Sequence, residues 1–149
     1  MASVKSITRK RAVREIGQLY KRAKGFDLAK CAYCGDLRQA LDHVPPISYA
    51  YSSIDIPKFL KNGGAFLLFP VCDCCNQLLG AKTLISYAER VQWLYKKYAE
   101  LIIETSWSEE ELEEIGRGLK TMILAYEKQR KEYIKKLHEI ESKMIAVCV

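Results

Sequence analysis

The chain has 149 residues, enough for one domain with an appended helical part, and 49% of them are hydrophobic, which suffices for a packed core. The formal net charge of +6 and the pI near 9.0 favour a polyanionic partner. No run of about eighteen apolar residues is present, and the basic N-terminal stretch lacks the apolar segment of a secretory signal, so the sequence predicts a cytoplasmic protein that does not span a membrane.

The first predicted element is an amphipathic helix over residues 6–24. Its apolar residues recur at helical spacing, its basic residues fill the other faces, and Gly25 is expected to end it. Residues 1–30 hold nine Lys or Arg and two acids, a net charge of +7, so the rest of the chain sums to −1. The helix is either a packing helix with a solvated basic face or an arm that contacts backbone phosphates. The second interpretation predicts nucleic-acid contacts by Arg9, Lys10, Arg11, Arg14, Lys21 and Arg22.

A short turn with two cysteines follows. The segment CAYCG at residues 31–35 has the CxxC spacing of a zinc knuckle, and its glycine tolerates the positive φ with which the chain folds back. Residues 39–44 predict a strand. Pro45 and Pro46 are expected to end it, because proline has no backbone donor.

The middle of the chain predicts a second strand and two short helices. Residues 47–64 have no regular pattern apart from a short helix near residues 57–61. Residues 65–71 are strongly apolar and predict the second strand, which leads directly to Cys72. A short helix is expected over residues 73–79, where a glycine follows.

Two long amphipathic helices are predicted in the last part of the chain. The first covers residues 83–102, and the second runs from a capping box at Ser108 to about Met144, with residues 105–107 as the link. Consecutive amphipathic helices favour an antiparallel hairpin. The hairpin either only packs on the rest of the chain or also presents a seam for a homodimer.

The cysteines predict a zinc site. Six cysteines in a chain without export features favour metal binding over disulfides. Structural zinc takes four ligands in a tetrahedron, which two CxxC pairs supply. The predicted ligands are Cys31, Cys34, Cys72 and Cys75. Cys74 is an alternative second member of the later pair, but CxxC spacing fits a knuckle turn better, so Cys74 is placed outside the site and Cys148 is taken as a free thiol.

An Asp-His dipeptide lies between the two cysteine pairs. Of the two histidines in the chain, His138 lies among charged residues of the last predicted helix and is expected to be solvated. Phosphodiester hydrolysis needs a base that activates water and a cation that stabilises charge on the phosphate. An imidazole suits the base, and carboxylate and carboxamide oxygens suit Mg²⁺. Asp42, His43 and Asn76 therefore form a candidate hydrolytic site.

The order CxxCG, LDHVPP and CxxCN over residues 31–82 resembles the HNH endonucleases of the ββα-metal superfamily. The resemblance implies an α+β fold in which two antiparallel strands and a helix surround one Mg²⁺ or Mn²⁺ ion. It implies that His43 is the general base and that Asp42 and Asn76 bind the catalytic ion. The four cysteines would then hold a separate structural Zn²⁺.

The chain departs from the family pattern on the second strand. The family usually carries an Asn there, where this chain has Leu67, and the nearest substitute is Asn62 in the preceding turn. Lys82 is the nearest match to the basic residue that usually follows the motif, and it is a further predicted nucleic-acid contact.

The sequence thus predicts three parts, which are a basic N-terminal helix at 1–30, an HNH core with a zinc site at 31–82 and a helical hairpin at 83–149. The favoured function is hydrolysis of double-stranded DNA. One alternative is an HNH-like zinc module that binds nucleic acid or a protein without catalysis. The other is a helical interaction protein in which the hairpin is the working surface.

Overall fold

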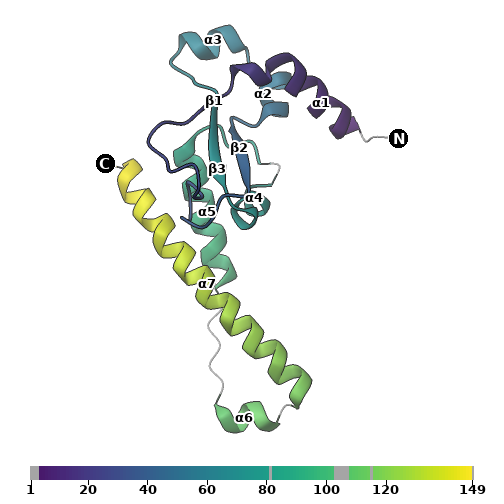
Figure 1. Cartoon of the computed structure of the whole chain (residues 1–149), viewed down its shortest axis with the longest axis vertical. Helices are drawn as coiled ribbons and strands as arrows, with labels where there is room; N and C mark the ends of the chain where they lie inside the picture. The colour runs from purple at the N-terminus through teal and green to yellow at the C-terminus, as the bar shows by residue number, and fades with distance from the viewer. Residues whose placement is uncertain (1–3, 81, 103–107, 115, 149) are drawn as a thin grey trace.

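The computed structural model describes residues 4–80, 82–102, 108–114 and 116–148. These residues form an α+β fold with seven α-helices, one 3₁₀ helix and a three-stranded mixed sheet. The N-terminal helices gather at one end of the sheet, and the long C-terminal helix runs alongside it and extends past the other end (Figure 1). The predicted α+β class is therefore confirmed, and the ββα-metal core within it stays a prediction.

The sheet is built on the two predicted strands. β2 (Ala40–Val44) and β3 (Leu67–Val71) pair in antiparallel fashion, with Asp42 opposite Phe69. Both strands begin slightly later than expected. Their pairing places the turn that precedes β2 beside the end of β3, where the two cysteine pairs lie.

The expected helix over residues 6–24 is wrong after Ile16, and the sequence pattern does not predict the third strand that follows. The chain here runs as α1 (Val4–Ile16), η1 (Gly17–Leu19) and β1 (Lys21–Arg22). β1 pairs in parallel with β3, and the amides of Lys21 and Ala23 donate to carbonyls beside and within β3 at 3.0 and 2.9 Å. The open edge of β3 satisfies these backbone groups, so tertiary pairing overrides the helical pattern.

A small core joins the N-terminal helix to the middle of the chain. α1 packs on α2 (Ile47–Ser53), a helix that the sequence pattern does not predict, and α3 (Ile56–Lys61) lies where a short helix is expected. At the start of α3, the side chain of Asp55 accepts a hydrogen bond from the amide of Lys58 at 3.2 Å. The buried members of this core are Ala12, Ile16, Tyr20, Ile47, Ala50 and Phe66.

Two helices follow the sheet. α4 (Asp73–Leu79) confirms the predicted short helix and ends at Gly80, whose φ of 51° favours glycine. α5 (Tyr87–Leu101) begins later than expected, because Ser86 caps it by accepting a hydrogen bond from the amide of Glu89 at 3.2 Å.

The last predicted helix is divided into α6 (Glu109–Glu114) and α7 (Arg117–Cys148). The expected cap is present, because the Ser108 hydroxyl accepts a hydrogen bond from a first-turn amide at 3.1 Å. The division falls beside Gly116, whose φ of 85° is not helical. The predicted link at residues 105–107 lies outside the described residues.

α5 and α7 form the predicted antiparallel pair, and their packing continues into the cysteine-bearing part of the chain (Figure 1). The fully buried members of this main core are Tyr33, Val71, Cys75, Leu79, Val91, Leu94, Tyr98 and Ile140. The hairpin therefore shares one hydrophobic core with the predicted zinc site. Leu119 and Met122, near the start of α7, are 49% and 68% exposed, and a homodimer seam there stays a prediction. Among the described helices, none has the length and apolar character needed to cross a lipid bilayer.

Candidate metal centre and adjoining cavity

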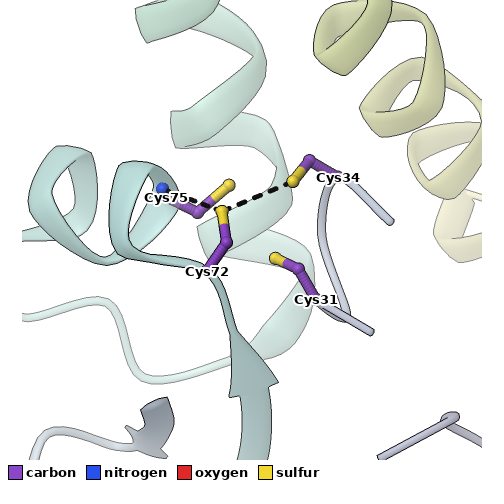
Figure 2. Close-up of side chains that lie close together, drawn as sticks. All are labelled: Cys31, Cys34, Cys72 and Cys75. Carbon is purple, nitrogen blue, oxygen red and sulfur yellow. Dashed lines mark hydrogen bonds between the residues drawn. The ribbon is translucent and has the colours of Figure 1, made fainter. Parts of the chain in front are cut away.

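The four predicted zinc ligands meet in one buried cluster (Figure 2). The Sγ atoms of Cys31, Cys34, Cys72 and Cys75 all lie within 4.8 Å of one another. The first pair lies on the turn before β2, where the Gly35 amide donates to the carbonyl of Cys31 at 3.0 Å. The second pair spans the end of β3 and the first turn of α4, where the Cys75 amide donates to the Cys72 sulfur at 3.4 Å.

This cluster fits a structural zinc ion. In a tetrahedral site with Zn–S distances of about 2.3 Å, neighbouring sulfurs are about 3.8 Å apart, and those of Cys34 and Cys72 lie 3.5 Å apart. Thiols this close share protons. A hydrogen bond from Cys34 lowers the pKa of the Cys31 thiol to about 7, and hydrogen bonding to Cys31 raises the pKa of the Cys34 thiol. A bound Zn²⁺ would allow all four sulfurs to be thiolates together.

Cys74 lies outside the four-sulfur cluster, as the CxxC spacing predicts. Its sulfur accepts a hydrogen bond from the Tyr98 hydroxyl at 3.3 Å, and the same hydroxyl lies 3.1 Å from the Cys75 sulfur. Tyr98 of α5 therefore holds Cys74 and Cys75, in the first turn of α4, against the main core. The side chain of Cys148 lies outside the described residues.

A lysine of the C-terminal helix borders the cysteine cluster. Nζ of Lys136 lies 3.3 Å from the Cys34 sulfur and 3.8 Å from the Cys72 sulfur, and it forms an ion pair with Asp36. Burial opposes the charge on Lys136, but Asp36 and the neighbouring thiolates outweigh burial and raise the pKa of this lysine.

The predicted hydrolytic residues line a cavity of about 710 Å³. β2 supplies Asp42 and His43, and α4 supplies Asn76. Arg9 of α1 and Arg90 of α5 also line it. The fold therefore brings a carboxylate, an imidazole, a carboxamide and two guanidinium groups to one cavity.

The carboxylate of Asp42 is held by a buried arginine. Nε of Arg90 donates to Oδ2 at 2.7 Å, and Nη2 donates to Oδ1 at 2.5 Å, while Nη1 donates to the carbonyl of Leu84 at 2.8 Å. The Tyr33 hydroxyl also donates to Oδ2 at 2.6 Å. These bonds fill three of roughly four acceptor positions on the carboxylate. The metal-binding role of Asp42 stays a prediction, and an ion would share this carboxylate with Arg90.

Neither buried cation is predicted from the sequence pattern. Arg90 precedes Leu94 by four residues on α5, and Lys136 precedes Ile140 by four residues on α7. Both of these apolar residues are fully buried. The sequence signal for such a buried cation is a charged residue at a position where the helical period predicts an apolar one. That signal does not say which partner balances the charge.

His43 is half-buried, and its ring packs edge-on against that of Tyr20 with centroids 4.9 Å apart. Burial lowers the pKa of the imidazole from its usual 6.5, the charge of Arg9 lowers it further, and Asp42 partly opposes both. The ring is therefore neutral at neutral pH, which is the form that can accept a proton.

We expect a proton NMR titration to give His43 a midpoint below 6.5, because its surroundings disfavour the charged ring. Protons then bind the unfolded chain more readily than the folded one. The contribution of His43 to the free energy of unfolding is therefore complete above pH 6.5, and it decreases as pH falls through the folded pKa. His43→Gln should remove that part of the pH dependence. The variant His138→Gln identifies the NMR signal of the other histidine, whose side chain is 74% exposed. A His43 midpoint at or above 6.5 would contradict the expectation.

The remaining predicted nucleic-acid contacts lie on the surface. Lys10, Arg11, Arg14, Lys21 and Arg22 are exposed on α1 and β1. Of the predicted basic contacts, Arg9 is the one that lines the cavity. Lys82 is exposed, and its Nζ lies 4.6 Å from the centroid of the Trp93 ring.

Within the described chain, no other asparagine takes the place of the one that the HNH pattern usually carries on its second strand. Leu67 lies in β3 opposite Val44. Asn62 is exposed at the end of α3 and does not line the cavity. His43 has the Tyr20 ring as its packing partner.

Comparison with protein families, curated proteins and solved structures gives no match to this chain. Its function is therefore inferred from the geometry of its own residues. These form a buried four-cysteine cluster that fits Zn²⁺, and a cavity that joins an imidazole to a buried carboxylate and two guanidinium groups.

Proposed function

We propose that the protein is an HNH-type endonuclease that hydrolyses phosphodiester bonds of double-stranded DNA with Mg²⁺ or Mn²⁺. The observation that supports this most is the convergence of Asp42, His43 and Asn76 on one cavity. By the motif resemblance, Asp42 and Asn76 correspond to the two metal ligands and His43 corresponds to the general base. The exposed basic residues of α1, whose Arg9 reaches the same cavity, suit a polyanionic substrate.

In the proposed reaction, the neutral imidazole of His43 takes a proton from the water that attacks phosphorus, and the bond to the leaving oxygen breaks. Asp42 and Asn76 would hold the divalent ion through oxygen atoms, and the ion would stabilise charge on the phosphate and the leaving oxygen. Arg90 fixes the orientation of the Asp42 carboxylate. Arg9 contributes positive charge to the wall of the cavity.

A second candidate function is an HNH-like zinc module that binds nucleic acid or a protein without cleavage. Two observations favour it. Arg90 and Tyr33 already occupy most of the Asp42 carboxylate, and Leu67 replaces the Asn that the family usually carries. The cysteine cluster and the exposed basic helix would serve this function equally well.

We expect the zinc-loaded protein to nick supercoiled plasmid DNA with Mg²⁺ or Mn²⁺. The cleavage should stop when EDTA is added during a short incubation. His43→Ala should lower the rate by about 10²- to 10⁴-fold, because a general base contributes a factor of that size. His138→Ala is the matched control, since its side chain is 74% exposed on α7, and it should cleave as the parent protein does.

The same assay separates the two candidate functions. Zinc-bound parent protein that shifts DNA in a gel but cleaves none of several substrates would support the non-catalytic module. Cleavage that survives His43→Ala would remove His43 from the reaction and point to a contaminating nuclease or to another base.

A further inference from the structure

We propose that Lys136 is the charge-neutralising partner of the zinc centre, and that its ammonium group increases the zinc affinity of the cluster by donating to the thiolates of Cys34 and Cys72. This inference is independent of any nuclease activity. It assigns to the C-terminal helix a direct part in metal binding, through a residue 102 positions away from Cys34 in the chain.

The three donors of the lysine match three acceptors. An ammonium group carries three N–H bonds and no acceptor. Nζ of Lys136 has the Cys34 sulfur at 3.3 Å, the Cys72 sulfur at 3.8 Å and a carboxylate oxygen of Asp36 in an ion pair. Two of the three acceptors around the ammonium group are therefore sulfurs of zinc ligands.

Charge balance explains why a lysine is suited to this position. Zn²⁺ with four thiolates carries a formal charge of about −2, because each coordinated cysteine is deprotonated. All four cysteines are buried, and a buried charge is unfavourable unless it is paired and hydrogen-bonded. Lys136 is itself only 8% exposed. Charge-assisted N–H···S contacts from it would therefore be stronger than contacts made in water.

The lysine and one member of the cluster also border a cavity. A second cavity of about 320 Å³ is lined by Cys72 and Cys74 together with Asp36 and Lys136. α7, which carries the lysine, passes beside Cys34 (Figure 2).

The test is zinc retention by the full-length, zinc-loaded protein in competition with a colorimetric chelator. Lys136→Met keeps most of the apolar side chain and removes the charge, and we expect it to weaken zinc binding by about 10- to 100-fold, the usual effect of losing a partner of a metal ligand. Lys135→Met makes the same change at the exposed neighbouring position, and it should leave zinc affinity unchanged. Lys136→Arg, which keeps the charge, should recover most of the loss.

Asp36→Asn distinguishes charge neutralisation from simple packing. Asp36 is 39% exposed, and without its carboxylate the ammonium group of Lys136 remains with the sulfurs, so zinc should be held as tightly as in the parent protein or more tightly. A loss of zinc affinity in Asp36→Asn would overturn the proposal, as would a Lys136→Met protein that binds zinc like Lys135→Met. If Lys136→Met does not fold, Lys136→Gln is compared with Lys135→Gln in the same competition, and equal zinc binding by these two variants would overturn the proposal.

Discussion

Cys75→Ala should give a protein that neither retains zinc nor unfolds cooperatively, whereas Cys74→Ala should do both. Cys75 is fully buried and belongs to the four-sulfur cluster, while Cys74 lies outside it. In zinc-finger peptides a structural zinc site contributes about 10–16 kcal/mol of apparent binding free energy. This is as large as, or larger than, the free energy of unfolding of an ordinary domain, which is roughly 5–15 kcal/mol. Loss of one ligand should therefore unfold the core around β3, α4 and α5.

The matched pair isolates metal binding because the two cysteines are adjacent and both lie near the Tyr98 hydroxyl. Zinc content by elemental analysis and thermal unfolding by circular dichroism are the measurements. Cys74→Ala loses at most a hydrogen bond to sulfur, an effect of about 1 kcal/mol. Equal zinc content in the two variants, with equally sharp unfolding, would show that zinc binding does not require Cys75.

Arg90→Gln should lower the free energy of unfolding by about 3–5 kcal/mol, because removing one member of a buried ion pair leaves the other charge uncompensated. Arg90 and Asp42 are only 3% and 6% exposed, and the guanidinium group makes two hydrogen bonds to the carboxylate. Burial disfavours the charge on Arg90, but the bonds to Asp42 more than offset this and raise the pKa of the arginine.

Lys97→Gln is the matched control on the same helix. Lys97 pairs with Glu100, and these side chains are 33% and 52% exposed. An exposed pair contributes about 0–1 kcal/mol, so the control should be nearly neutral in denaturant unfolding of the zinc-loaded protein. The double variant Asp42→Asn/Arg90→Gln should recover much of the loss, because no charge is then left buried. An Arg90→Gln protein as stable as Lys97→Gln would mean that water reaches the Asp42 carboxylate.

The sequence by itself determined the features that depend on local spacing. The CxxC pairs predicted all four members of the cysteine cluster and excluded Cys74. The short segment before the two prolines predicted β2, the apolar run before Cys72 predicted β3, and the glycine after residues 73–79 marked the end of α4. These predictions succeed because turn geometry, strand propensity and helix termination are decided by residues close together in the chain.

Tertiary structure alone decided where the buried charges go and how far the first helix runs. Lys21 joins the sheet because β3 offers an unpaired edge, which no pattern in residues 6–24 reveals. Arg90 and Lys136 interrupt apolar seams, but their partners Asp42 and Cys34 lie far away in the sequence. A buried cation is tolerated only where packing brings it an anionic partner. That pairing depends on how α5 packs beside β2 and α7 beside the cysteine turn, and helical periodicity carries no information about it.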